Sequence, residues 1–339
     1  MHMSDALISP AVGGTGYFAS AAVIGYSIYK IKQQSDNIKV PLMGVLGAFV
    51  FAAQMINFSI PGTGSSGHIC GSLLLAVLLG PYAAAVVITS VLLTQALFFA
   101  DGGLVALGCN IINMGLIPCF IAYPLVYKTI AGVNSDKRRI WFACIAASVI
   151  GLQLGAGAVV METTFSNISE LPFSSFVMLM LPIHLPIGLI EGMITASVLV
   201  MLKQTRPDIL SETVLSDNKT FPPLKKVYIS FVILALITGG IVSWFASSHP
   251  DGLEWAIDKT TGKEELETEN SVMVKAAEFQ EKTAFLPDYA FSDADSRTSE
   301  LAGTSVSGII GALITLLISV AVGIFVRVMQ GRKLISENG

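Results

Sequence analysis

Charged residues are scarce in this sequence. Asp, Glu, Lys and Arg make up only 13% of its 339 residues, whereas 53% are hydrophobic and the mean hydropathy is +0.70. An ordinary soluble domain has about 25% charged residues, so the composition indicates a membrane protein. The net charge is only −4 and no basic stripe runs along the chain, which excludes a typical nucleic-acid-binding protein.

The sequence also lacks a basic N-terminal region and cysteines with the spacing of a metal site. The first ten residues contain no Lys or Arg, so the apolar run 12–31 is interpreted as a retained helix rather than a secretory signal. The four cysteines lie in apolar runs without C-x-x-C spacing, which predicts buried thiols rather than disulfides or a zinc site: Cys70, Cys109, Cys119 and Cys144.

Long apolar runs are abundant. One of them, 69–79, ends at Gly80-Pro81 and is too short to span a bilayer upright, so we expect it to begin inside a cavity. The others are long enough to span: 12–31, 40–58, 82–100, 104–127, 140–161, 174–202, 227–245 and 305–328. Lys and Arg gather in alternate short loops, which predicts a multi-pass protein of the inner (plasma) membrane with its N-terminus outside and its C-terminus in the cytoplasm.

The runs predict an all-α integral membrane protein made of two modules. Residues 1–202 form a seven-helix bundle, and 227–339 form a two-helix module with an extracytoplasmic segment, 250–304. Residues 203–226, which contain three prolines, are expected to be a cytoplasmic linker. The extracytoplasmic segment is rich in acidic residues, among them Glu264, Glu265, Glu267 and Glu269.

His2 is placed where a chelate can form. The α-amine, the amide nitrogen between residues 1 and 2, and the imidazole of residue 2 can close adjacent rings around one metal ion. Planar nitrogen ligation suits Ni(II) or Cu(II) rather than tetrahedral zinc. Because the amine must lose a proton, the metal affinity should rise with pH. The alternative is a histidine that stands by chance on a frayed terminus.

His68 follows the Gly/Ser-rich loop 61–67 and precedes the short apolar run. Non-helical backbone at membrane depth is tolerated only where protein or a water-filled cavity surrounds it, so this imidazole is a candidate fourth ligand. The alternative is a histidine that caps a helix or packs the loop. The glycine spacing of the loop resembles a phosphate-binding loop but lacks the Lys and Ser/Thr that follow, so no nucleotide site is predicted.

His184 and Glu191 lie two helical turns apart and share a helix face. Ionisable groups inside a membrane are candidates for function, although the flanking Pro182 and Pro186 also allow His184 to satisfy backbone groups at a kink. Three further residues are candidates for roles beside the site or along a pathway, with hydrogen bonding between helices as the alternative for the asparagines: Ser66, Asn110 and Asn113.

Three segments resemble a known family. The start Met1–Pro10 and the loop Gly64–His68 are similar to the ligand segments of CbiM/NikM proteins, the substrate-capturing subunits of energy-coupling factor transporters for cobalt and nickel. Pro250–Glu254 reads PDGLE, the signature of the small companion subunit CbiN or NikN, here fused to the same chain. The sequence departs from the commoner start at Ala6-Leu7, where Gly and an aromatic residue often stand.

The resemblance implies a seven-helix bundle like that of other substrate-binding components of these transporters. It implies that Met1, through its amine and backbone amide, and the side chains of His2 and His68 bind the transported ion, Ni(II) or Co(II). It also implies a transmembrane coupling subunit and cytoplasmic ATPase subunits as partners, ATP-driven import, and neither a cofactor nor an enzymatic activity of the chain itself. The planar chelate and the fused companion favour nickel.

Two other classes of protein remain as alternatives. A secondary transition-metal transporter, which works without ATPase partners, usually has inverted repeats and broken helices at the membrane midplane, and the sequence has no convincing repeat. A membrane enzyme needs a nucleophile, a paired acid and base, or a catalytic metal motif, none of which accompanies His184 and Glu191.

Overall fold

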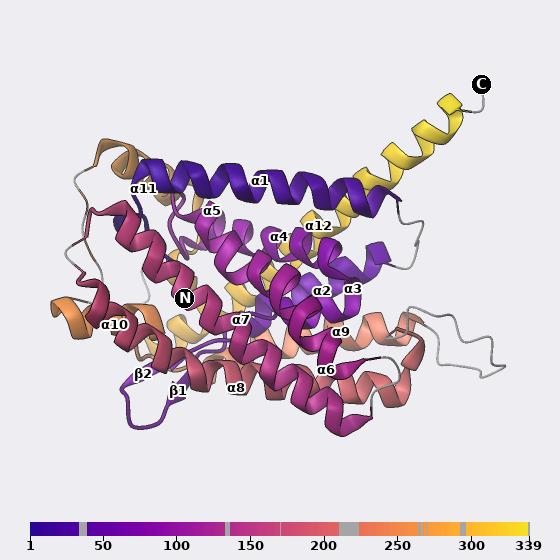
Figure 1. Ribbon diagram of the computed structural model, residues 1–339, viewed down its shortest axis with the longest axis horizontal. Coiled ribbons are helices and arrows are strands. Elements are labelled where there is room, and N and C mark those ends of the chain that lie inside the picture. The colour runs from indigo at the N-terminus through magenta and orange to yellow at the C-terminus, as the bar shows by residue number, and fades with distance from the viewer. Residues whose placement is uncertain are drawn as a thin grey trace.

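The computed structural model describes residues 1–33, 39–132, 136–169, 171–209, 224–263, 266, 268, 270–291 and 296–337. The four acidic residues named above and most of the predicted linker, 210–223, lie outside them. The described part is almost entirely helical, with one small hairpin (Figure 1).

The helices up to residue 205 are α1 (Pro10–Gln33), α2 (Lys39–Gln54), α3 (Ser72–Leu79), α4 (Pro81–Phe99), α5 (Leu107–Asn110), the π-helical η2 (Ile111–Leu116) and η3 (Pro118–Tyr127), α6 (Lys128–Ala131), α7 (Lys137–Ser166) and α8 (Phe173–Thr205). The later helices are α9 (Leu224–Gly240), α10 (Gly252–Thr261), α11 (Ser271–Thr283) and α12 (Arg297–Glu337). Short 3₁₀ turns are η1 (Asp5–Leu7), η4 (Pro207–Ile209), η5 (Val242–Phe245) and η6 (Pro287–Tyr289).

Five helical stretches of the described chain are long and apolar enough to cross a membrane: Pro81–Phe99, Leu107–Ala131, Lys137–Ser166, Phe173–Thr205 and Arg297–Met329. They correspond to five of the predicted crossings. The other predicted crossings fall on α1, whose 24 residues include many Gly, Ser and Tyr, and on the shorter α2, α3 and α9, of 16, 8 and 17 residues. A multi-pass membrane protein follows, as expected, whereas the arrangement of seven plus two crossings stays a prediction.

Glycines allow the long helices α7 and α8 to lie side by side. A Cβ atom at Gly188 would lie 2.8 Å from the Cα of Val149, and one at Gly192 would lie 2.5 Å from the Cα of Ile145. Any larger residue would push the two backbones apart, because real Cβ contacts are not this short. Small residues are what membrane helices use for such contacts.

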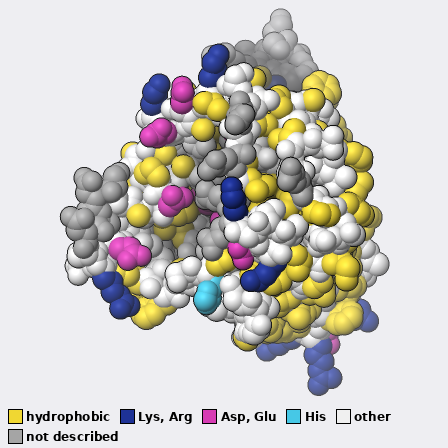
Figure 2. All heavy atoms as spheres, turned by 90° about the vertical axis from the view of Figure 1, so that its left-hand side faces the viewer, with side chains coloured by type: hydrophobic (Ala, Val, Ile, Leu, Met, Phe, Trp, Pro, Cys, Tyr) yellow, Lys and Arg dark blue, Asp and Glu magenta, His cyan; other side chains and the backbone are white. Residues whose placement is uncertain are grey.

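The last helix, α12, packs against α2, α9 and α4. Gly308 of α12 faces Gly239 of α9, where a Cβ would lie 2.2 Å from the Gly239 carbonyl oxygen. Large apolar side chains on the outward faces of α7, α8, α9 and α12 are exposed, among them Phe142, Leu185, Ile233 and Leu317. Such exposure suits a surface that contacts lipid. Figure 2 shows the hydrophobic flank beside an end of the molecule that is hollowed and carries both acidic and basic side chains.

The hairpin and the short helix α3 follow one another. Strands β1 (Phe58–Ile60) and β2 (Ser65–Gly67) are antiparallel, with Ser59 opposite Ser66. The chain then turns through Gly71, which has φ +77°, into α3, and α3 is almost fully buried. The short apolar run therefore forms a helix that begins inside the protein, as its length predicted.

Candidate metal-binding site

The first three residues are packed into the protein rather than frayed, and the His2 side chain between the two methionines is 9% exposed. Met3 is fully buried and Met1 is 7% exposed. Asn110 holds this segment in place, since its Oδ1 accepts from Met3 N at 2.8 Å and its Nδ2 donates to Met3 O at 3.1 Å. Asn113 donates to Glu162 Oε2 at 2.6 Å and lies 3.6 Å from the Met3 sulfur. Both asparagines therefore position the N-terminal segment instead of only joining helices.

The α-amine of Met1 lies beside His68. The distance from the amine nitrogen to His68 Nε2 is 3.5 Å. His68 Nδ1 lies 3.0 Å from the carbonyl oxygen of Ile69. A carbonyl can only accept, so Nδ1 carries the proton and Nε2 presents its lone pair to the amine. Residues that are 67 positions apart thus bring two nitrogen donors together.

His2 lies beside the Met1 amine and His68. Its ring stacks on the ring of His68, with centroids 5.1 Å apart and planes inclined by 16°. His2 Nδ1 faces Asp101 Oδ1 at 3.1 Å, and His2 Nε2 faces Gln95 Oε1 at 3.2 Å. The nitrogen that closes the predicted chelate is therefore paired with Asp101, so the imidazole must turn before the chelate can form.

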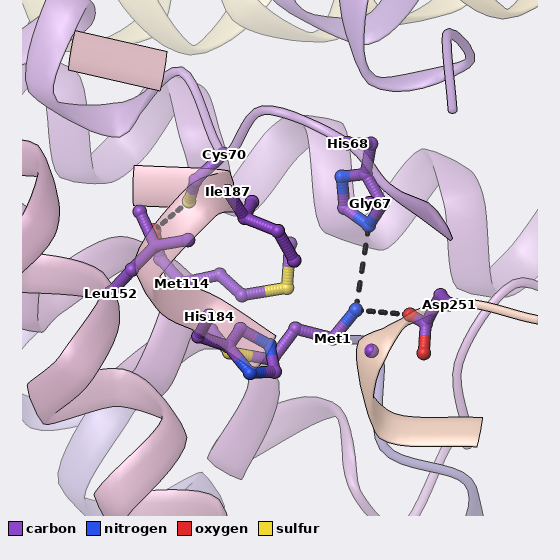
Figure 3. A pocket seen from close by; sticks show the side chains of 10 residues that line it. Met1, Gly67, His68, Cys70, Met114, Leu152, His184, Ile187 and Asp251 are labelled. Atoms are coloured by element: carbon purple, nitrogen blue, oxygen red, sulfur yellow. Dashed lines mark hydrogen bonds and ion pairs between the residues drawn. The ribbon is translucent and has the colours of Figure 1, made fainter. Parts of the chain in front are cut away.

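Asp251 from the PDGLE segment reaches into the same site. One carboxylate oxygen accepts from the backbone nitrogens of Leu253 and Glu254 at 2.7 and 3.0 Å and caps α10. The other forms an ion pair with the Met1 amine (Figure 3). The sequence identified this segment only as a family signature and did not predict the contact of Asp251 with the Met1 amine. The D-x-x-E spacing of a capping box predicts that Asp251 begins a helix but gives no sign of what its second oxygen binds.

Burial and charge set the protonation of the groups at the site. Burial, aided by the nearby amine, lowers the pKa of His68 to about 3. Burial also lowers the pKa of His2, although Asp101 opposes this shift. For Asp251 burial favours the neutral acid, but the adjacent ammonium outweighs it, so the pKa of the carboxyl lies well below its usual range. The imidazole of His68 is thus neutral and able to bind a metal at physiological pH.

A second set of contacts joins the later part of the chain to the site. Tyr289 donates its hydroxyl to Asp101 Oδ2 at 2.5 Å, and Asp101 in turn faces His2. Ser66 donates from its backbone nitrogen to Pro250 O at 2.8 Å and from its hydroxyl to His249 O at 2.8 Å. Ser66 therefore fixes the PDGLE segment to the hairpin, whereas the sequence alone suggested only a place beside the site.

His184 and Glu191 have separate surroundings, although they share a helix. His184 lines a pocket with Met1, His68 and Asp251 (Figure 3). Both carboxylate oxygens of Glu191 instead accept backbone N–H groups at the start of α3, from Cys70 at 2.9 Å and Gly71 at 3.1 Å. A carboxylate at a helix N-terminus is stabilising, and we infer that Glu191 anchors α3.

Other candidates for metal ligation do not cluster. The four cysteines are free and buried, as expected. In the part of the chain that the structure describes, no group of three His, Cys, Asp or Glu side chains could hold a metal ion. The N-terminal amine and its neighbouring amide are donors of a different kind, because they belong to the backbone and not to such side chains.

Comparison with known proteins shows which family the chain resembles. Residues 2–209 match a family model described as the cobalt uptake substrate-specific transmembrane region, CbiM, and residues 225–328 match the PDGLE domain. A putative fused nickel transport protein, NikMN, from Archaeoglobus fulgidus is 34% identical over 96% of this chain and 99% of its own length. The cobalt transport protein CbiM of Sorangium cellulosum is 30% identical over 62% of this chain and 94% of its own.

A solved structure supports the fold. A crystal structure of a transition metal transporter covers 60% of this chain and 93% of its own, with a TM-score of 0.53 and 28% identity. The relatives are named as transport proteins, which agrees with a transport subunit rather than an enzyme. The chain belongs to the CbiM family of cobalt-uptake substrate-specific membrane proteins and carries a fused PDGLE domain.

Proposed function

We propose that the chain is the substrate-specific subunit of an energy-coupling factor transporter and captures Ni(II), or Co(II), at its outer face for ATP-driven import. One observation carries this proposal: the buried Met1 amine lies 3.5 Å from His68 Nε2, and the His2 ring is stacked on His68. Three of the four nitrogen donors named from the sequence come from residues 1 and 2, and the fourth lies beside them.

Metal capture requires two exchanges at this site. The amine leaves Asp251 and gives up its proton, and the amide nitrogen between residues 1 and 2 also loses its proton. The His2 ring turns its Nδ1 from Asp101 toward the amine, and Nδ1 loses its proton while Nε2 keeps the one that faces Gln95. The amine, the amide nitrogen and Nδ1 then supply three donors in a plane, and His68 Nε2 supplies the fourth. Because planar nitrogen sets suit Ni(II), we propose nickel as the preferred ion, with cobalt accepted.

We also propose how the chain is oriented in the membrane and which partner subunits it has. We place the N-terminus outside and the C-terminus in the cytoplasm, with seven crossings in residues 1–202 and two in 227–339. The basic residues of the alternate short loops support this orientation. The chain would work with a transmembrane coupling subunit and cytoplasmic ATPase subunits.

Uptake in membranes tests the partnership. Radioactive Ni(II) should accumulate in vesicles only when the chain, the coupling subunit and the ATPase subunits are present together with ATP. A matched preparation with an ATPase subunit inactivated should accumulate none. Accumulation by the chain alone, without ATP, would instead identify a secondary transporter.

We further propose that the PDGLE module assists metal loading, because Asp251 and, through Asp101, Tyr289 contact the groups around Met1 and His2. A chain that ends at Leu224 should still bind Ni(II) but should support uptake about tenfold more slowly with the same partners, the effect typical of losing groups that orient metal ligands. The measurement is initial uptake at matched membrane expression. Equal rates for the truncated and full-length chains would show that the module is dispensable.

A further inference from the structure

The pocket behind the Met1 amine contains another imidazole, that of His184 on α8 (Figure 3). This side chain is only 1% exposed. Its Nδ1 lies 2.7 Å from the carbonyl oxygen of Met180. Because that oxygen can only accept, Nδ1 carries the proton and Nε2 has a lone pair. His184 and His68 thus use the same tautomer.

The Nε2 atom of His184 faces the site and has no hydrogen-bond donor among the described residues. A Cβ atom at Gly252 would lie 3.5 Å from this nitrogen, which places it against the PDGLE segment next to Asp251. This nitrogen can therefore bind a ligand that enters the pocket.

A structural role at a proline kink does not explain the hydrogen bond that His184 makes. Proline removes the N–H that would bond the carbonyl four residues earlier, so Pro182 and Pro186 free the carbonyls of Met178 and of Pro182 itself. His184 binds neither of them, because its partner is the carbonyl of Met180. The kink that the two prolines suggested in the sequence therefore does not account for the imidazole.

The chemistry of the pocket selects the class of ligand. His68 and His184 supply imidazole nitrogens and Met114 supplies a thioether. The Asp251 carboxylate also lines the pocket but pairs with the Met1 amine. The Cys70 thiol is engaged with the Met114 carbonyl at 2.7 Å. Nitrogen and sulfur donors suit late transition metals and not magnesium or calcium. The cavity has a volume of about 10 Å³, close to the least that holds one water molecule, so it has room for an ion stripped of most of its water.

We propose that His184 forms a second station for the metal. After capture by Met1, His2 and His68, the ion passes to His184 Nε2 while His68 remains bound, and then continues into the bundle. This proposal rests on the proposed function and adds an inward step to it. Glu191 takes no part in it, because both of its oxygens hold the start of α3.

A matched pair of variants of the full-length chain tests the station. His184→Cys and His184→Ser have similar volumes, and both can donate to the Met180 carbonyl, but only the thiol is a good ligand for Ni(II) or Co(II). Both should keep the Ni(II) affinity of the outer site within about threefold. With the partner subunits, the serine variant should import Ni(II) at least about tenfold more slowly than wild type, and the cysteine variant should recover most of the rate.

The absorption spectrum of bound Co(II) separates metal ligation from an effect on packing. When the purified cysteine variant is titrated with Co(II), a thiolate-to-cobalt absorption band should appear that wild type and the serine variant lack. Equal uptake by the two variants, or no new band, would overturn the second station. If neither small side chain folds, His184→Met against His184→Leu gives the same contrast in uptake at larger volume, because only the thioether can bind the metal. Failure of the proposed function is distinct, because wild type itself would then bind no Ni(II).

Discussion

Replacement of His68 by alanine is expected to weaken Ni(II) binding by at least about 100-fold. Its Nε2 lies 3.5 Å from the Met1 amine and presents its lone pair to that amine, and its ring stacks on that of His2. Loss of a group that only orients a ligand already costs about 10–100-fold, and His68 both binds and orients. The measurement is the dissociation constant of the full-length protein by equilibrium dialysis with Ni(II).

His249→Ala and His184→Ala are the matched controls. His249 contacts Ser66 and Ser247 through its backbone groups, and His184 belongs to the proposed second station. Both variants should keep the affinity of wild type within about threefold, an effect below 1 kcal/mol. If His184→Ala weakened equilibrium binding more than His68→Ala, the capture site would have to move inward and the case for a secondary transporter would be revived.

An extension of two residues before Met1 should abolish capture almost completely. The chelate needs a free amine on residue 1 and an imidazole on residue 2, and an extension removes both conditions at once. Met1 is 7% exposed and its amine pairs with Asp251, so an added peptide also finds no room in the site. The dissociation constant for Ni(II) should rise by at least about 1,000-fold, which corresponds to about 4 kcal/mol.

A cleavable extension supplies the control within one preparation. Protease treatment that restores Met1 as the first residue should restore binding, which separates the loss of the chelate from any damage to the fold. The thermal unfolding temperature before and after cleavage reports on the fold directly. Tight Ni(II) binding by the uncleaved chain would show that the terminal amine is not a ligand.

Much of the fold follows from local pattern. Apolar runs of spanning length predicted the helices that became α4, α7, α8 and α12, and the length of the run 69–79 predicted a helix that begins inside the protein. Two predicted crossings are weaker in the structure for different reasons, because α9 is apolar but has only 17 residues, whereas α1 contains many Gly, Ser and Tyr. The π-helical turns of η2 and η3 were not predicted from the sequence, although η3 begins at Pro118 and contains Pro124.

The candidate site was predicted only in part, because its contacts join distant segments. His2 and His68 could be named from the start of the chain and the Gly/Ser loop. Asp251 and Tyr289 meet that region across more than 180 residues of sequence, and no periodicity encodes such a contact. The pairing of His2 Nδ1 with Asp101 was equally hidden, since a side-chain rotamer depends on neighbours that only the folded chain brings together.

X-ray absorption of Ni(II) bound to the full-length protein tests the central claim most directly. A chelate from Met1, His2 and His68 predicts four nitrogen donors in a planar arrangement, with no sulfur and no oxygen in the plane. Six oxygen-rich donors around the nickel, or a sulfur ligand in place of the amine, would contradict capture by the N-terminal chelate.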